Sequence, residues 1–333
     1  MKRLGVIGAT TWGTTLAIIA AREGVEVNLL VRSSEESDKL NEHGENRRFV
    51  PGFSFPQNVK VTEQPEEALS NADAIIFAVP SPSLRDNARK VKAQINEQSV
   101  VVSAVKGLEI GTNKRMSQIL EEELYGVAHD RICALSGPNL AGEIVRGKPS
   151  STVVASANEE SSRIIQNMLT SSRMRVYTNP DIVGVEIAGS MKNVTAIAVG
   201  ISDGLSLGAN AKASLITRGL SEISKLGSAL GANRITFSGL AGMGDLIATC
   251  SSELSRNGNV GRMLAGGKNL KEITSTMNNV AEGIVTTKAV ISVANQSGID
   301  VPLSKTVYDV LFNEVLPMDA LKSLMLRNPT SEE

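Results

Sequence analysis

The chain contains few cysteines, histidines and aromatic residues, and it carries almost no net charge. Of its 333 residues, two are cysteine, two are histidine and 3% are aromatic, and 34 basic residues stand against 35 acidic ones. Two cysteines, Cys133 and Cys250, cannot build a disulfide framework and are typical of a reducing compartment, so we expect a cytoplasmic protein. With only two histidines, His43 and His129, we expect no multi-histidine site and no metal.

The same scarcities narrow the classes of partner. Few aromatic residues argue against base-stacking platforms, and a net charge of −1 argues against a basic nucleic-acid-binding domain. The uncharged stretch 4–21 follows Met1-Lys2-Arg3 and superficially resembles a signal peptide. Three glycines and four threonines interrupt it, and a membrane span needs about 20 predominantly apolar residues. We therefore expect no nucleic-acid partner, no signal peptide and no membrane span.

The first half of the sequence alternates short apolar runs with stretches of helical spacing. Apolar residues recur at helical spacing in 14–22 and 116–124. The short apolar runs show no alternation with polar residues, as expected for strands that are covered by helices on both faces. They therefore predict a largely parallel sheet. The predicted strands are Leu4–Gly8, Val25–Val31, Ala74–Val79, Val100–Val105, Ile132–Leu135 and Thr152–Ala155.

The first predicted strand runs into a glycine-containing turn. The segment Leu4-Gly-Val-Ile-Gly8-Ala-Thr-Thr-Trp-Gly13 lies where a G-x-G-x-x-G dinucleotide fingerprint would lie, between a strand and a helix. Gly8 and Gly13 occupy its first and third glycine positions. Thr10 occupies the second, where glycine normally lets the backbone approach the pyrophosphate. From the turn alone, dinucleotide binding and a plain strand-to-helix turn both stay open.

The end of the second predicted strand bears on the type of dinucleotide. An acidic residue at this point would bind the 2′-hydroxyl of an adenine ribose, but the chain has Arg32, followed by Ser33 and Ser34. This arrangement favours a 2′-phosphate, and hence NADP over NAD. The alternative interpretation of Arg32 is an ordinary solvated cation in a loop.

After Pro180 the pattern changes. No run of β-branched strand residues follows, and the long stretches 183–199, 211–230, 285–294 and 304–312 have helical periodicity. At roughly 150 residues per domain, the length also favours two domains. We predict an α/β Rossmann-like doubly wound sheet over residues 1–180 and an all-α domain over residues 181–333.

Further segments combine glycines with polar residues in a way that a plain core does not need. They are Ala104-Val-Lys106-Gly-Leu-Glu109, Ser136-Gly137-Pro138-Asn139-Leu140-Ala141, Gly189-Ser-Met-Lys192-Asn193 and Gly239-Leu-Ala-Gly-Met-Gly-Asp245-Leu, which continues to Ser255-Arg256-Asn257. Lys106 follows a predicted strand, and open α/β sheets bind ligands at the carboxyl ends of their strands. Lys192 lies in an apolar helical stretch. It is either a functional lysine or a helix cation that reaches out to water.

These segments together resemble the bacterial type of NAD(P)-dependent glycerol-3-phosphate dehydrogenase. The longest match runs from 184–194 through 211–219, and the matching motifs extend from Gly8 to Glu282. The resemblance implies an N-terminal Rossmann domain and a C-terminal helical substrate domain. It also implies interconversion of dihydroxyacetone phosphate and sn-glycerol 3-phosphate by hydride transfer with NAD(P)H, feeding glycerophospholipid synthesis. The expected partner is a small phosphorylated triose or glycerol.

The resemblance also implies individual roles. Lys192 resembles the catalytic proton carrier, with Lys106 as a cation beside it and Asp245 holding either the substrate hydroxyl or Lys192. Arg256 resembles a phosphate clamp, because a guanidinium offers two parallel hydrogen bonds to phosphate. The expected substrate contacts are Lys106, Gly137, Asn139, Asp245, Ser255, Arg256 and Asn257. The expected cofactor contacts are Gly8, Thr11, Trp12, Gly13, Arg32, Lys106, Ala141, Arg256, Val280 and Glu282.

Several of these residues also have structural interpretations. Trp12 can be a core aromatic, Glu282 a surface charge, and Ser255 the N-cap of a helix. Asn139 departs from the serine that is usual in the family.

Two other functions stay open from the sequence. One is a dehydrogenase of similar build acting on another β-hydroxy acid, which would need a carboxylate site. The other is a non-catalytic nucleotide-binding or scaffold protein, favoured by the threonine at the second fingerprint position. Our hypothesis is that a small shift of the turn accommodates Thr10, with its hydroxyl bonded to a phosphate oxygen. The oligomeric state also stays open, with a homodimer among the alternatives.

Overall fold

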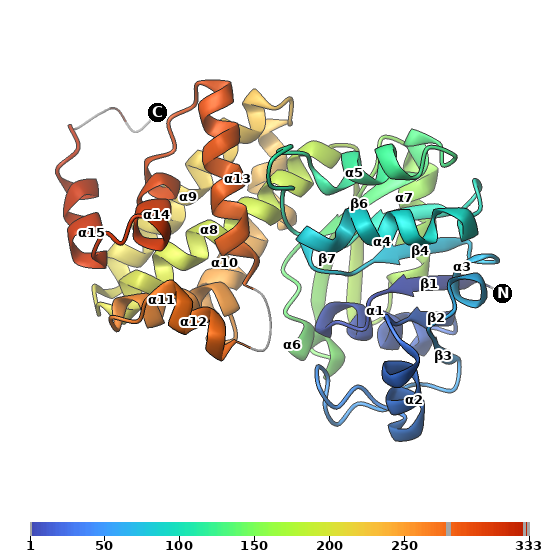
Figure 1. Cartoon of the computed structure of the whole chain (residues 1–333). Coiled ribbons are helices and arrows are strands. Elements are labelled where there is room, and N and C mark those ends of the chain that lie inside the picture. Colours follow the sequence, from blue (N-terminus) through green and yellow to red (C-terminus); the bar gives the residue numbers. More distant parts are fainter. Residues whose placement is uncertain (1, 278–280, 329–330, 332–333) are drawn as a thin grey trace. The chain divides into compact units, whose positions relative to one another are not determined.

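The computed structural model describes residues 2–277, 281–328 and 331. They form two compact units (Figure 1). Unit 1 comprises the chain up to Lys106 together with Lys114–Glu186, and unit 2 comprises Gly107–Asn113 together with the chain from Ile187 onward.

Unit 1 is built on an eight-stranded sheet in the order β3-β2-β1-β4-β5-β6-β7-β8. Its first six strands follow the order of doubly wound dinucleotide-binding sheets. All neighbours pair in parallel except β6 and β7, which are antiparallel. The predicted α/β doubly wound fold is confirmed. The strands are β1 (Arg3–Ile7), β2 (Glu26–Leu30), β3 (Val59–Thr62), β4 (Ala74–Phe77), β5 (Val100–Ser103), β6 (Ile132–Ser136), β7 (Ser150–Ala155) and β8 (Met174–Asn179).

Helices cover both faces of this sheet. On one face, Leu16 of α1 and Ile165 of α7 pack into one apolar cluster with the strands. On the other face, Leu84 of α4 and Ile119 of α5 pack into a second cluster. This double cover explains why the central strands are apolar throughout. The helices are α1 (Thr11–Arg22), α2 (Ser34–His43), α3 (Pro65–Leu69), α4 (Leu84–Val91), α5 (Met116–Glu123), α6 (Ala141–Val145) and α7 (Glu159–Leu169), with short 3₁₀ turns η1 (Ser81–Ser83), η2 (Lys92–Gln94) and η3 (His129–Arg131).

Two strands, β3 and β8, were not predicted from the sequence. β3 has only four residues, two of them buried, and β8 alternates between buried and exposed residues over its first four positions. Both lie at the edges of the sheet, where no strand covers the outer side. A search for continuously apolar runs therefore passes over them. Helix α1 also begins at Thr11, before the predicted start at Thr14, because Thr10 caps it.

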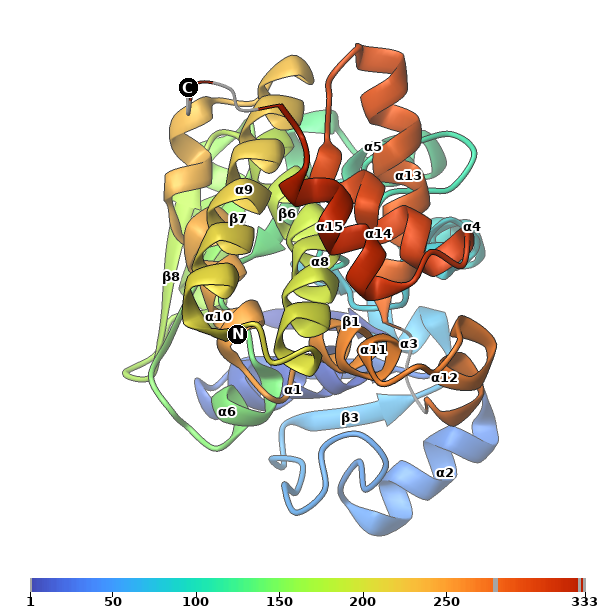
Figure 2. The same cartoon turned by 90° about the vertical axis from the view of Figure 1, so that its left-hand side faces the viewer.

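Unit 2 contains only helices among its described residues, as predicted for the C-terminal half. Its central helix is α8, and Figure 2 shows it with α9, α14 and α15. The elements are α8 (Ile182–Gly204), which begins within unit 1, α9 (Gly208–Ala229), the 3₁₀ turn η4 (Arg234–Ser238), the π-helical turn η5 (Leu240–Gly244), α10 (Asp245–Ser251), α11 (Arg256–Ala265), α12 (Leu270–Thr276), α13 (Glu282–Ser297), α14 (Pro302–Phe312) and α15 (Pro317–Met325).

Helix α8 is mostly apolar because other helices surround it. Among the described residues it is the one helix long and apolar enough to cross a membrane by length and composition, and 89% of its most apolar window is buried within the protein. A mostly apolar helix that is buried in this way is a core helix. It lies very close to α11, since a Cβ on Gly261 would lie 2.2 Å from the carbonyl oxygen of Ile197. A Cβ on Gly200 would likewise lie 2.2 Å from the carbonyl oxygen of Gly258, so the start of α11 also lies against α8.

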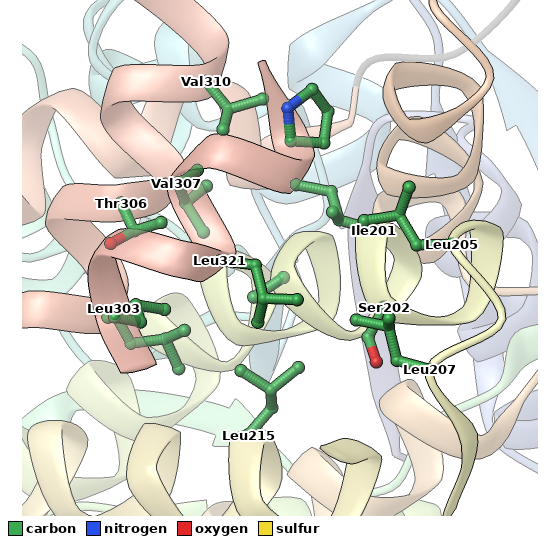
Figure 3. A pocket seen from close by; sticks show the side chains of 14 residues that line it. Ile201, Ser202, Leu205, Leu207, Leu215, Leu303, Thr306, Val307, Val310 and Leu321 are labelled. Carbon is green, nitrogen blue, oxygen red and sulfur yellow. The ribbon is translucent and has the colours of Figure 1, made fainter. Parts of the chain in front are cut away.

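A small cavity lies between α8, α9, α14 and α15 (Figure 3). The volume in which the centre of a water molecule fits is about 30 Å³. Aliphatic side chains make up nearly all of the cavity lining. Its hydroxyl groups are those of Ser202 and Thr306, and the Thr306 hydroxyl already donates to the carbonyl oxygen of Pro302 at 2.9 Å. Because a buried water needs two to four polar partners, this cavity suits no water. The Ser202 hydroxyl is buried there without a hydrogen-bond partner among the described residues.

We therefore predict that Ser202→Ala stabilises the protein. An unpaired buried hydroxyl costs about 1–3 kcal/mol, so its removal should raise the free energy of unfolding by about 1 kcal/mol. Denaturant unfolding measures this. Ser99→Ala is the matched control, because Ser99 is equally buried but donates to the carbonyl oxygen of Ala72 at 2.6 Å, and it should lose stability. A loss of stability in Ser202→Ala would contradict the prediction.

Candidate active site

The turn after β1 requires glycine at both of its glycine positions. Gly8 has φ +105°, and a Cβ there would lie 2.9 Å from the carbonyl oxygen of Ala78. A Cβ on Gly13 would lie 2.0 Å from the carbonyl oxygen of Gly8. The two glycines thus allow β1, β4 and the start of α1 to approach one another as a dinucleotide turn requires.

Thr10 replaces the middle glycine without strain. Its backbone is extended, with φ −72° and ψ 173°, a conformation open to any residue. Its hydroxyl donates to the carbonyl oxygen of Ala78 at 2.7 Å and accepts from the backbone N–H of Gly13 at 3.1 Å. Thr10 is therefore the N-cap of α1. Contrary to our expectation, its hydroxyl proton is given to Ala78 and is not available to a phosphate oxygen in this structure.

Three polar atoms in the predicted binding segments of unit 1 are buried without a hydrogen-bond partner among the described residues. They are Trp12 Nε1, Ser136 Oγ and Asn139 Oδ1. Trp12 is half-buried and packs against the core cluster of α1, so its core interpretation holds for the ring. Its N–H, the hydroxyl oxygen of Ser136 at the end of β6 and the side-chain oxygen of Asn139 in the following loop are groups that a bound ligand would satisfy.

Arg32 lies at the end of β2 with a largely exposed side chain. Its Nε lies 3.3 Å from a carboxylate oxygen of Glu36, in the first turn of α2. Ser33 caps α2, accepting from the backbone N–H of Glu36 at 3.3 Å. A ligand phosphate at this point would compete with Glu36 for the guanidinium.

Lys106 and Gly137 are close together at the carboxyl ends of β5 and β6. The Lys106 ammonium donates to the carbonyl oxygen of Gly137 at 3.0 Å. Nearby, the amide nitrogen of Asn139 donates to the Thr152 hydroxyl at 2.9 Å, and Ala141 begins α6. Asn139 thus holds the loop to β7.

In unit 2, Lys192 forms a buried ion pair. Lys192 of α8 is 7% exposed and Asp245 of α10 is 1% exposed. The Lys192 ammonium donates to the Asp245 carboxylate and, at 2.7 Å, to the Thr249 hydroxyl. A buried charge is stable only when it is paired and hydrogen-bonded in this way. Asp245 was expected to contact either the substrate hydroxyl or Lys192, and in this structure it contacts Lys192.

Thr249 was not among the predicted site residues. It lies four residues after Asp245 on α10, so both side chains lie on one face of that helix, and this spacing was a signal that could have identified it. The π-helical turn η5 lies directly before Asp245, and such turns recur at functional sites. The neighbouring Cys250 is buried, which raises the pKa of its thiol to about 12 and leaves it unreactive.

A second buried polar cluster joins α8, α11 and α13. The amide nitrogen of Asn257 donates to the side-chain oxygen of Asn193 at 2.9 Å, and its own oxygen accepts from the backbone N–H of Gly283 at 3.0 Å. Asn193 follows Lys192 directly, and Gly283 follows Glu282. Asn257 was predicted from its motif, whereas Asn193 and Gly283 were not predicted as site residues, because their contacts with Asn257 join distant parts of the chain.

The start of α11 carries the predicted phosphate clamp. Ser255 is the N-cap, accepting from the backbone N–H of Gly258 at 3.1 Å, and Arg256 is the first helical residue. More than a third of the Arg256 surface is exposed, yet the surrounding chain partly desolvates the guanidinium and lowers its pKa, while the charge of Glu282 acts in the opposite direction. Glu282 begins α13, and Val280 lies outside the described residues.

The predicted residues therefore form one group in each unit. The group in unit 1 consists of the glycine turn, Arg32 and the loops after β5 and β6. The group in unit 2 consists of the Lys192 pair, the asparagine cluster and the start of α11. A helix N-terminus carrying an arginine suits a phosphate, and a buried lysine held by a carboxylate suits proton transfer.

Comparisons with known proteins cover the whole chain. Residues 3–162 match the family model for the N-terminus of NAD-dependent glycerol-3-phosphate dehydrogenase, and residues 181–322 match that for its C-terminus. Relatives called glycerol-3-phosphate dehydrogenase (NAD(P)+) include one from Dehalococcoides mccartyi, 47% identical over 100% of this chain and 93% of the relative. Another, from Chlorobium limicola, is 44% identical over 99% of both chains. The crystal structure of glycerol-3-phosphate dehydrogenase from Coxiella burnetii is similar with a TM-score of 0.93, at 36% identity over 98% of this chain and 99% of that one.

We predict that Asn257→Ala destabilises the protein. It leaves the oxygen of Asn193 and the N–H of Gly283 buried without these partners, and each such group costs about 1–3 kcal/mol. We expect the free energy of unfolding to fall by about 2–4 kcal/mol, measured by urea unfolding. Asn259→Ala, on the exposed side of the same helix, is the control and should change it by less than about 0.5 kcal/mol. Equal losses in the two variants would contradict the role of the cluster.

Proposed function

The chain belongs to the family of NAD(P)-dependent glycerol-3-phosphate dehydrogenases, and from this premise we propose that it interconverts dihydroxyacetone phosphate and sn-glycerol 3-phosphate. The observation that carries the proposal is the buried contact of Lys192 with Asp245 and Thr249. Oxidation of an alcohol requires a group that accepts the hydroxyl proton, and reduction of a ketone requires one that returns it. Lys192 is that group in our proposal.

Asp245 and Thr249 position the Lys192 ammonium. Both lie on α10 and hold the same Nζ atom, so the amine keeps one orientation while it gives or takes a proton. The nicotinamide cofactor supplies or accepts the hydride. We assign Lys106 to contacts with both the substrate and the cofactor. Gly137 and Asn139, in the adjoining loop, are assigned to contacts with the substrate.

The phosphate of the substrate is assigned to the start of α11. Arg256 offers a bidentate guanidinium there, and the helix N-terminus adds the positive end of its dipole. Ser255 and Asn257 shape this segment through their contacts with Gly258, Asn193 and Gly283. We assign Arg256 and Glu282 to the cofactor as well, together with Val280.

The residues of unit 1 fit a dinucleotide. The turn at Gly8 and Gly13 leaves no room for a Cβ at either position, and the buried N–H of Trp12 lacks an acceptor among the described residues. The cofactor group of the proposal is Gly8, Thr11, Trp12, Gly13, Arg32 and Ala141. Residues 1–180 form the cofactor domain and residues 181–333 the substrate domain.

The wider setting is also part of the proposal. The product sn-glycerol 3-phosphate would supply the backbone of glycerophospholipids, with the cytoplasm as the place of reaction and no metal taking part. Free Cys133 and Cys250 support a reducing compartment. A homodimer stays a prediction.

The first experiment follows nicotinamide absorbance during incubation with dihydroxyacetone phosphate, with NADH and NADPH in separate reactions. We expect oxidation that depends on the substrate. A β-keto acid panel serves as the control for a dehydrogenase of another specificity. Folded protein that oxidises neither cofactor would favour the non-catalytic nucleotide-binding alternative.

We predict that Lys192→Ala lowers kcat by about 10²–10⁴-fold, the contribution typical of a positioned proton carrier. This change leaves Asp245 buried without its cation, which destabilises the protein. The unfolding transition of the variant is therefore measured together with its activity. Lys192→Arg is the second variant. It keeps a cation beside Asp245, but a guanidinium does not give up its proton, so the protein should fold and still lose turnover. Turnover retained by folded Lys192→Arg would overturn the assignment.

We infer a preference for NADP from Arg32, and this gives a separate prediction. Arg32→Ala should weaken NADPH binding about 10-fold or more, the loss of a charge-assisted hydrogen bond, and leave NADH binding within about twofold. Glu36→Gln removes the carboxylate that competes for the guanidinium and should strengthen NADPH binding. Isothermal titration calorimetry with both cofactors measures this. Equal weakening for NADH and NADPH in Arg32→Ala would contradict the preference.

A further inference from the structure

We propose that Thr10 is a positioning residue of the dinucleotide site, whose hydroxyl holds the phosphate-binding turn in its binding conformation before the cofactor arrives. This inference rests on the proposed function, because it concerns the same cofactor. It assigns a positive role to the residue that departs from the glycine fingerprint.

The first observation is that one hydroxyl joins two separate elements. Thr10 Oγ1 donates to the carbonyl oxygen of Ala78, just beyond β4, and accepts from the backbone N–H of Gly13 in α1. The backbone N–H of Ala78 donates in turn to the carbonyl oxygen of Ile7 at 2.9 Å. Ala78 is therefore bonded on one side to the end of β1 and on the other to the turn that follows β1. A glycine at position 10 has no group that makes the second connection.

The second observation concerns the donors left for a ligand. The first backbone N–H groups of a helix have no partner within the helix, and they are the groups that bind phosphate. In α1, Thr10 uses the N–H of Gly13, while the N–H groups of Thr11 and Trp12 have no hydrogen bond among the described residues. The turn thus keeps two donors for a phosphate, and the bridge fixes their direction.

A fixed turn binds a ligand more tightly than a mobile one of the same shape, because less conformational entropy is lost on binding. The glycine-rich segment Gly8-Ala-Thr-Thr-Trp-Gly13 gains this restraint from a side chain. Threonine at this position therefore prevents the closest approach of the backbone to the pyrophosphate, but it holds the turn in a formed conformation before binding.

The test compares two variants that separate the hydroxyl from the bulk of the side chain. Thr10→Val keeps the branched shape and loses both hydrogen bonds, whereas Thr10→Ser keeps the hydroxyl. For NADH and NADPH, measured by isothermal titration calorimetry, we expect Thr10→Val to raise Kd about five- to tenfold, the equivalent of one lost helix cap. Thr10→Ser should stay within about twofold. In the protein without cofactor, Thr10→Val should also lower Tm by about 2–4 °C.

Asn158→Ala controls for loss of a helix cap elsewhere in unit 1. Asn158 caps α7 and bonds Asp130, which precedes β6, so it lies at the opposite end of the sheet from the turn. It should lower Tm and leave Kd unchanged. If Thr10→Val lowers Tm but keeps the Kd of the unaltered protein, Thr10 is merely structural and the inference is overturned. A tighter Kd in Thr10→Val would also overturn it, since the threonine would then be an obstacle. If the unaltered protein binds neither cofactor, the proposed function fails as well.

Discussion

A charged group in the core must have its partner built beside it, and the Lys192–Asp245 pair imposes this requirement on unit 2. Lys192 lies on α8, a mostly apolar helix, and its carboxylate partner comes from another helix. Helix α10 supplies both Asp245 and Thr249 from one face. The π-helical turn before α10 and the close contact of α8 with α11 are the backbone features that fit these helices around the pair.

The same rule applies to neutral polar groups, and it explains how unit 2 joins three helices around one asparagine. The amide nitrogen of Asn257 donates to Asn193, and its side-chain oxygen accepts from the backbone N–H of Gly283. A single side chain thus satisfies polar groups on α8 and α13. Because Asn193 follows Lys192 and Gly283 follows Glu282, the cluster fixes the backbone next to both. The helices that carry the proposed catalytic and phosphate-binding residues are thereby held by polar contacts as well as by apolar packing.

Much of this was predictable from the sequence, and the failures share one cause. The central strands of unit 1 were predicted because burial on both faces makes them apolar throughout, whereas the edge strands β3 and β8 lack that pattern. Lys192, Asp245 and Arg256 were identified from motifs, since each stands in a distinctive local segment. Thr249 was within reach through its spacing from Asp245. The bridge from Thr10 was not, because its acceptor, Ala78, is 68 residues away in the chain.

Buried polar atoms without partners have different meanings in different surroundings. Ser202 faces a cavity lined almost entirely by aliphatic side chains, which offer its hydroxyl no partner, so the unpaired hydroxyl lowers the stability of the fold. Trp12 Nε1, Ser136 Oγ and Asn139 Oδ1 also lack partners among the described residues. Trp12 lies in the first turn of α1, just beyond β1, Ser136 is the last residue of β6, and Asn139 lies in the loop after it. Those are carboxyl ends of parallel strands, where open α/β sheets bind ligands. An unpaired group is therefore informative about function only where its surroundings can admit the partner that it lacks.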